Sequence, residues 1–299
     1  MQIRMPLLAA VCVTAIWGLN VVALKIGVTE IPPSLLNTLR FALLAVLLLP
    51  FARIPWSTLP SVLLIGLLMG VGHFYLLTLG ASYVSSNTTV IIVITGAPIS
   101  SLLAYLLKME KLSRKQMTGI TIAFSGTAIP LLLSGSVDLT LGTLIIVASM
   151  TFWAMTNIII RKLDDIPLLS LQFWIGIITA PACFFGYYLA GNSMDIVSQI
   201  TVPVIITVVY MVIFSSIIGY YLWFAIINQH GINRIVHVTL LQPLFTMVFA
   251  YLLLDEVLSG PQLLSAGVTL AGMGIYYHKK RCDKAAAQAA LNADSGKDN

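Results

Sequence analysis

Long apolar runs without charged residues recur along the whole chain, and they constrain its fold more than any other feature. About twenty apolar residues are enough for a helix to cross the hydrocarbon core of a membrane. Of the 299 residues, 59% are hydrophobic and only 9% are charged, whereas an average soluble protein carries about 25% charged residues. Too few charges remain to cover a water-facing surface, so the sequence predicts an all-α integral membrane protein.

Pro, Gly, Asn, Ser and charged residues interrupt these runs and divide them into ten predicted transmembrane helices. No connection between them is long enough for a soluble domain, so the function is expected to lie in the helical bundle. The three cysteines have neither metal-binding nor disulfide spacing, and no cofactor or metal is expected. The predicted helices span residues 6–28, 33–52, 60–80, 86–107, 115–134, 140–160, 167–190, 202–227, 232–254 and 260–278.

The basic residues predict the orientation of the bundle. With the N-terminus in the cytoplasm, 14 of the 16 lysines and arginines fall in cytoplasmic segments, and the other two, Lys25 and Arg40, lie within predicted helices. By the positive-inside rule, we expect a multi-pass protein of a bacterial plasma (inner) membrane with both termini in the cytoplasm. The net charge of +5 is therefore a feature of membrane topology, and no nucleic-acid partner is expected.

The two halves of the chain are related by an internal repeat with a constant offset of 146 residues. Because each predicted half has five helices, an odd number, the second half must be inverted in the membrane. Inverted repeats are typical of transporters, since one site between two such halves opens to either side. The predicted domains are residues 1–134, 135–278 and a cytoplasmic tail, 279–299. The matched pairs are Tyr105 and Tyr251, Glu110 and Glu256, and Gln116 and Gln262.

Short motifs at both ends of the repeated region indicate a family. The first half contains Trp17-Gly18-Leu19-Asn20, Lys25, Pro32-Pro33 and Leu39-Arg40-Phe41, and the second half contains Leu-Asp-Glu-Val-Leu-Ser at 254–259, followed by Gly267 and Gly272. Together they resemble the EamA-type family of the drug/metabolite transporter superfamily over residues 6–278. The resemblance implies ten helices in two inverted five-helix repeats. Helices 1–4 and 6–9 would enclose a central cavity, and helices 5 and 10 would lie at the periphery. It also implies export of amino acids or related metabolites.

Arg40 is a costly residue for a membrane helix and the first candidate for substrate contact. It lies eight residues beyond Pro32, about 12 Å into the second helix. All eleven acidic residues fall in loops, at helix ends or in the tail, so no carboxylate is expected to pair with it at membrane depth. A substrate carboxylate would suit its planar guanidinium. The alternative is that Arg40 snorkels or caps backbone carbonyls.

Two further candidate pairs combine a tryptophan with an asparagine on one helix face. Trp17 and Asn20 are spaced i, i+3, and Trp153 and Asn157 are spaced i, i+4 in the second half. Substrate contact and interhelical hydrogen bonding both fit these spacings. Lys25 lies near the outer end of its helix, where snorkelling is the favoured interpretation.

Histidines within the predicted helices leave proton coupling open. His73 and His237 are candidate proton carriers, with a structural hydrogen bond as the alternative for each. Pro98 and Pro243 are candidate hinges, because proline kinks helices. The candidate substrate-binding residues are Trp17, Asn20, Asn37, Arg40, His73, Tyr75, Trp153, Asn157, Tyr220, Trp223, His237 and Gln242.

The predicted function is a secondary transporter that exports a zwitterionic or carboxylate-bearing small molecule by alternating access. One alternative is an importer or exchanger of sugars, nucleotide-sugars or phosphorylated metabolites on the same fold. Phosphate recognition normally uses several basic groups, and only two lie within the helices. A non-transport membrane protein is the other alternative, and it would leave the inverted repeat unexplained. No HExxH motif or pair of membrane aspartates is present, so the sequence predicts no enzyme and no catalytic residues.

Overall fold

The computed structural model describes residues 6–108, 112–134, 137–160, 167–223 and 241–276, together with residues 226 and 238. Within these ranges the chain forms helices and turns and no strand, as the composition predicts. The helices are α1 (Pro6–Glu30), α2 (Pro33–Leu48), η1 (Leu49–Phe51), η2 (Trp56–Thr58), α3 (Leu59–Ile65), η3 (Gly66–Tyr75), α4 (Leu76–Tyr83), α5 (Ser86–Val93), α6 (Gly96–Leu106), α7 (Arg114–Ser134), α8 (Val137–Ile160), α9 (Leu168–Leu189), η4 (Val197–Gln199), α10 (Val202–Tyr210), η5 (Met211–Gly219), α13 (Gln242–Leu254) and a last helix at 260–276.

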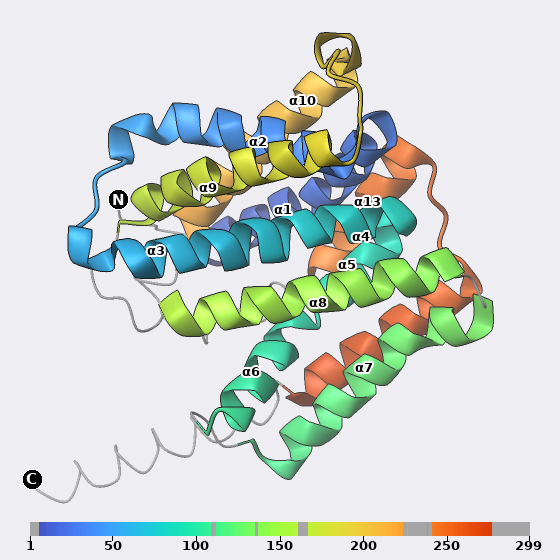
Figure 1. Cartoon of the computed structure of the whole chain (residues 1–299). Helices are drawn as coiled ribbons and strands as arrows, with labels where there is room; N and C mark the ends of the chain where they lie inside the picture. Colours follow the sequence, from blue (N-terminus) through green and yellow to red (C-terminus); the bar gives the residue numbers. More distant parts are fainter. Residues whose placement is uncertain are drawn as a thin grey trace, which may run out of the picture.

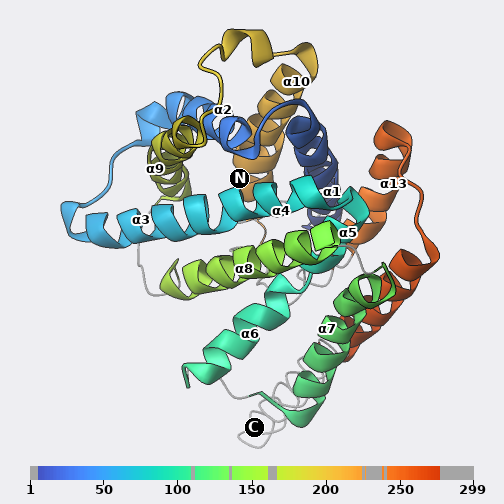
Figure 2. The ribbon, with the colours of Figure 1, turned by 45° about the vertical axis from the view of Figure 1, so that its right-hand side comes forward.

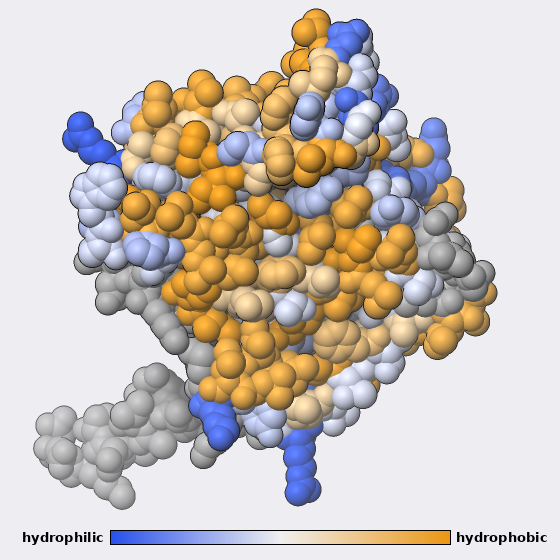
Figure 3. Space-filling model, viewed as in Figure 1, coloured by the Kyte–Doolittle hydropathy of each residue, from blue (hydrophilic) through white to orange (hydrophobic). Residues whose placement is uncertain are grey.

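Seven helices of the described ranges are long and apolar enough to cross a membrane. They are Leu7–Glu30, Pro33–Phe51, Trp56–Tyr83, Ser86–Leu106, Leu139–Ile159, Leu168–Leu189 and Val202–Trp223. Large apolar side chains on them, such as Leu67, Ile177 and Phe185, point outward and are exposed. Figure 3 shows the result as a broad apolar surface over α3, α8 and α9. Such a surface suits lipid, which confirms the expectation of a multi-pass membrane protein.

The helices form one bundle with a pair of helices at its margin. α1 contacts α13, α10 and η5, α2 lies along α9, and α8 contacts α4, η3 and α6. Figures 1 and 2 show α7 and helix 260–276 side by side, on the side of the molecule away from α2 and α9. The main apolar core lies among α1, α2, η3, α9, α10 and η5. The polar residues considered below therefore lie where these helices meet.

Two of the long helices widen into π-helical turns at related positions of the two halves. η3 interrupts the helix at 59–83, and η5 interrupts the helix at 202–223; the two begin 145 residues apart, at Gly66 and Met211. π-helical turns are rare and are found mostly at functional sites. Each carries a buried residue that contacts Arg40, Phe74 in η3 and Ser216 in η5.

The fourth predicted helix is divided in two. α5 ends at Val93 and α6 begins at Gly96, with a turn at Ile94 and Thr95 between them. Pro98 explains the break, because a proline has no N–H to donate to the carbonyl four residues earlier, here that of Ile94. Pro243 instead lies in the first turn of α13, where a proline is tolerated. The hinge role of either proline stays a prediction.

Candidate functional site

Arg40 is buried at the centre of the bundle. Only 1% of its surface is exposed, which favours a role inside the bundle over snorkelling. One guanidinium NH2 group donates to Ser216 Oγ at 3.1 Å. The guanidinium carbon lies 5.1 Å from the ring centroid of Phe41 and 4.8 Å from that of Phe74. The Nε is buried without a hydrogen-bond partner.

These contacts only partly compensate for burying a cation. Two aromatic faces attract the guanidinium, and one hydroxyl accepts from it. In the part of the chain that the structure describes, no carboxylate lies within ion-pair distance of Arg40. A buried charge without a counterion is costly. The arrangement therefore leaves a guanidinium with free donors, which is the geometry that a planar carboxylate recognises.

An aromatic cluster adjoins Arg40 on the α1 side. The Trp17 ring centroid lies 5.4 Å from that of Tyr220 and 5.3 Å from that of Trp223. Gly219 makes room for this cluster, because a Cβ there would lie 2.9 Å from Trp17 Nε1. Tyr220 lies four residues after Ser216, the residue that accepts a hydrogen bond from Arg40. The structure thus brings together three aromatic candidates and the candidate cation.

Asn20 has an acceptor without a partner. It lies one helical turn beyond Trp17, and its Oδ1 is buried without a hydrogen bond among the described residues. Buried amide oxygens are normally paired. An interhelical hydrogen bond, one of the two alternatives for Asn20, is therefore not made by this atom. The oxygen is therefore a buried acceptor without a partner in the described part of the chain.

Asn37 and His73 are held by structural hydrogen bonds. Asn37 Nδ2 donates to Pro33 O at 3.0 Å, and its Oδ1 accepts from Thr78 Oγ1 at 3.4 Å. His73 Nδ1 lies 2.9 Å from Ser149 Oγ, and that hydroxyl is also 3.0 Å from His73 O. The two bonds between His73 and Ser149 join η3 to α8. They favour the structural alternative for His73, which the sequence left open.

The other candidates are less closely connected to Arg40. Trp153 packs against Gly96 of α6, at 3.4 Å from the position of an added Cβ. Tyr75 and Asn157 are half-buried, and no hydrogen bond from either side chain is found among the described residues. Gln242 is half-buried at the start of α13. His237 lies outside the described residues.

Ser216 and Phe74 contact Arg40 and were not among the sequence candidates. Ser215-Ser216 is a polar pair within an otherwise apolar helix, and this was the available signal for Ser216. No sequence signal indicated a role for Phe74, because a single phenylalanine in an apolar helix cannot be distinguished from a residue that only packs in the core. Only the crossing of α2 with η3 and η5 places these side chains on the guanidinium.

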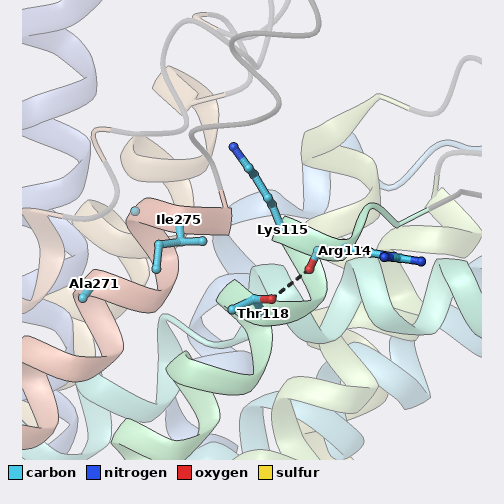
Figure 4. Close-up of a pocket in the computed structure, with 6 residues that line it drawn as sticks. Arg114, Lys115, Thr118, Ala271 and Ile275 are labelled. Atoms are coloured by element: carbon cyan, nitrogen blue, oxygen red, sulfur yellow. Dashed lines mark hydrogen bonds between the residues drawn. The ribbon is translucent and has the colours of Figure 1, made fainter.

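The surface grooves of the molecule lie away from these residues. A groove of about 600 Å³ lies between α7 and helix 260–276 and is lined in part by Thr118 and Ile275. Figure 4 shows the Arg114 and Lys115 side chains extending from α7 at its rim, with Arg114 pointing away from Ala271 and Ile275. Among the described residues, no group of three or more His, Cys, Asp or Glu side chains lies together as a metal site would require. The candidate site is therefore the buried surroundings of Arg40 and the Trp17 cluster.

The sequence model of the EamA-like transporter family matches this chain twice, at residues 4–132 and 140–277. The chain belongs to the EamA-like transporter family. It is therefore a membrane transporter and not an enzyme, and the resemblance seen in the motifs is confirmed. As a member of this family, the chain is expected to act on a small molecule in a lipid environment.

Curated relatives of this EamA-family chain cover nearly its full length. A protein of Salmonella typhimurium named "Probable amino-acid metabolite efflux pump" is 29% identical over 89% of this chain and 92% of its own length. A protein of the same name from Escherichia coli is 28% identical over 92% of this chain and 96% of its own length. An uncharacterized transporter of Archaeoglobus fulgidus is 27% identical over 88% of this chain and 95% of its own length. A solved crystal structure at 17% identity shares the fold, with a TM-score of 0.63 over 92% of this chain and 96% of that one.

Proposed function

We propose that this EamA-family transporter exports amino acids or related small metabolites from the cytoplasm by alternating access. Arg40 is the observation that carries the proposal, because its buried guanidinium has free donors and no carboxylate partner among the described residues. An amino acid supplies that carboxylate. The names of the Salmonella typhimurium and Escherichia coli relatives support the same substrate class.

The remaining polar and aromatic groups suit the other parts of a zwitterion. The unpaired Oδ1 of Asn20 is an acceptor for an ammonium group. The rings of Trp17, Tyr220 and Trp223 offer apolar faces to a substrate side chain and attract a cation. Phosphorylated compounds fit less well, because they are usually held by several basic groups, and Arg40 is the one described cation that is fully buried.

The bundle is proposed to contain ten membrane helices in two inverted repeats, residues 1–134 and 135–278, followed by a cytoplasmic tail. The two successive matches of the family model support the division. α7, α13 and helix 260–276 would complete the set with the seven apolar spans. Residues 279–299 lie outside the described residues.

Hydrogen bonds repeated at the offset of 146 residues support the repeat. Ser113 N donates to Gln116 Oε1 and Gln116 N donates to Ser113 Oγ, at the start of α7. The same reciprocal bonds join Ser259 and Gln262 at the start of the last helix. This capping box is a device for starting a helix, and it occurs at positions that differ by 146.

The contact between α7 and helix 260–276 supports a two-fold relation between the halves. A Cβ at Gly126 would lie 2.7 Å from Thr269 N, and one at Gly272 would lie 2.4 Å from Ala123 N. Gly272 is Gly126 plus 146, and Thr269 is Ala123 plus 146. The two contacts are therefore exchanged by the repeat, as expected for a pseudo-two-fold axis between inverted copies.

The location proposed for the chain is a bacterial inner membrane, with both termini in the cytoplasm. Described basic residues outside the bundle core support this orientation. Arg53, Lys108, Arg114 and Lys115 all lie in connections or helix ends that the alternation of spans assigns to the cytoplasmic side.

Export from dipeptide-loaded cells tests the proposed function. Cells that express the protein are loaded with dipeptides, and each amino acid released is measured; faster release of one amino-acid class identifies the substrate. Arg40→Gln at matched membrane levels should weaken substrate binding about tenfold to hundredfold, the value of a charge-assisted hydrogen bond. Arg40→Lys should be impaired too, since it loses the planar fork.

Arg53→Gln provides the matched control, because Arg53 is exposed in the loop after η1. It should transport like the wild type. Wild-type affinity in Arg40→Gln would reduce Arg40 to a structural residue and remove the main support for a carboxylate substrate.

A further inference from the structure

The turn between α4 and α5 is tied to the second half of the chain by Glu256. One carboxylate oxygen accepts from Ser86 N at 3.1 Å, and the other accepts from Asn87 N at 3.3 Å. These N–H groups belong to the first turn of α5, where a helix leaves its donors unpaired and favours a negative charge. Glu256 therefore completes a helix terminus that lies 170 residues earlier in the chain.

Gln262 adds a second link to the same turn. Its Nε2 donates to Ser85 Oγ at 3.0 Å and to Thr88 Oγ1 at 3.1 Å. Its Oε1 is held by Ser259 N in the capping box. The Gln262 amide is thus fixed at the start of helix 260–276, and its N–H groups donate to residues of the first half. Two residues of the second half, Glu256 and Gln262, hold one turn of the first.

Lys25 binds the first part of the same turn, at the end of α4. Its Nζ donates to Ala81 O at 3.2 Å and to Val84 O at 2.7 Å, at the C-terminal end of α4. A cation is favoured at a helix C-terminus. The ammonium therefore binds the end of α4, and the Glu256 carboxylate binds the start of α5. The snorkelling expected of Lys25 is replaced by these backbone contacts.

A hollow next to these bonds connects them with the surface. It has a volume of about 300 Å³ and is lined by Ser85, Thr88 and Gln262, among others. We call Lys25, Glu256 and Gln262, together with the turn 81–88, the clasp. Every group that takes part in its bonds is a charged group, an amide, a hydroxyl or a backbone group at a helix end. Water solvates such groups well when they separate, so the clasp is suited to open and re-form.

We infer that Glu256, Gln262 and Lys25 form the outer gate of the transport pathway, on the side of the bundle that lacks basic loops. The inference rests on the proposed alternating-access function. For a site between two inverted halves to open to one side, the bonds that join the halves on that side must break. The bonds of Glu256 and Gln262 to the turn 81–88 join the halves in this way, whereas those of Lys25 hold the turn from within the first half; all of them are formed in this structure.

Accessibility of a cysteine beside Arg40 tests the gate. Ser216→Cys is introduced into a chain whose native cysteines are replaced by serine, and intact cells are treated with a small impermeant thiosulfonate. Ser216 is 2% exposed, so labelling should be slow while the clasp is intact. Adding Glu256→Gln or Gln262→Ala should raise the labelling rate about tenfold, because the rate follows the population of the outward-open state.

Asp195→Asn is the matched control, since Asp195 is an exposed carboxylate that accepts from Ser198 N within its own loop. It should leave the rate unchanged. Equal rates in the Glu256→Gln, Gln262→Ala and Asp195→Asn chains, at matched membrane levels, would overturn the gate. The readout needs no substrate, so this failure would not affect the export proposal, and failed export would not affect the labelling result.

Discussion

Burial of single polar groups is the most informative feature at the scale of the residue. Arg40 has two aromatic faces and one hydroxyl around it, but Nε has no partner. Lys25, five residues beyond Asn20 on α1, instead donates to two carbonyl oxygens. Lys25 and Arg40 thus differ in how fully their donors are paired. Lys25 is stabilised by the carbonyl end of a helix, whereas Arg40 keeps a donor without a partner among the described residues.

Ser216→Ala is expected to weaken substrate binding through Arg40. The hydroxyl accepts from the guanidinium at 3.1 Å and holds it in one orientation. Loss of one hydrogen bond to a charged group costs about 1.5 kcal/mol, or roughly tenfold in affinity. The neighbouring Ser215→Ala, equally buried at 2% exposure, should bind like the wild type. Binding to purified protein by isothermal calorimetry checks both, and equal affinities in the two variants would separate Ser216 from substrate recognition.

At the scale of the element, close packing depends on small residues. α1 and α13 approach at Gly18, where a Cβ would lie 2.8 Å from Phe245 Cβ. α7 and the last helix approach at Gly126 and Gly272. Membrane helices associate by such contacts because lipid provides no hydrophobic driving force between them. Apolarity therefore brings helices into the membrane, and glycines determine which of them lie side by side.

Gly272→Ala should destabilise the peripheral helix pair, whereas Gly274→Ala should not. The new methyl group at 272 would meet Ala123 N at 2.4 Å and Gly119 O at 2.7 Å, which are backbone atoms that cannot move aside locally. Overpacking of this kind costs about 1–3 kcal/mol. At Gly274, two residues further along the same helix, nothing lies within 4 Å. Thermal unfolding in detergent should show a lower Tm for Gly272→Ala alone; equal Tm values would contradict the packing of α7 on helix 260–276.

At the scale of the whole molecule, the two halves meet through polar contacts at one end and through Arg40 at the centre. Arg40 of α2 donates to Ser216 of η5, and Glu256 accepts from the start of α5. Each bond joins the first half to the second. A transporter that exposes one site alternately to two sides needs such contacts to be breakable. The orientation of the bundle in the membrane decides which end faces the outside of the cell.

Cysteine labelling tests that orientation. In the cysteine-free background, Met194→Cys should react with an impermeant maleimide in intact cells, because Met194 is exposed in the loop after α9. Lys115→Cys, at the start of α7, should react only after the cells are permeabilised. The distribution of basic residues predicts this pattern. The opposite pattern would reverse the orientation and place the clasp on the cytoplasmic side.

The sequence by itself determined the class, the family and the kind of residue to look for. Length and apolarity specify membrane helices because an unpaired backbone is too costly in lipid, and the motifs around Trp17, Arg40 and 254–259 indicated the EamA family, which the family match confirms. The offset of 146 residues was visible without coordinates. The sequence also identified Arg40 as a charge that is costly to bury, since no acidic residue is predicted at the same depth in the membrane.

Only the tertiary structure decided which side chains surround Arg40 and what Lys25 does. Ser216 lies 176 residues from Arg40, and Glu256 lies 170 residues from Ser86. Contacts of that separation depend on how the helices cross, and the π-helical turns η3 and η5 change which faces they present. Apolar periodicity carries no information on these crossings, because in a membrane helix the lipid-facing and the buried sides are both apolar.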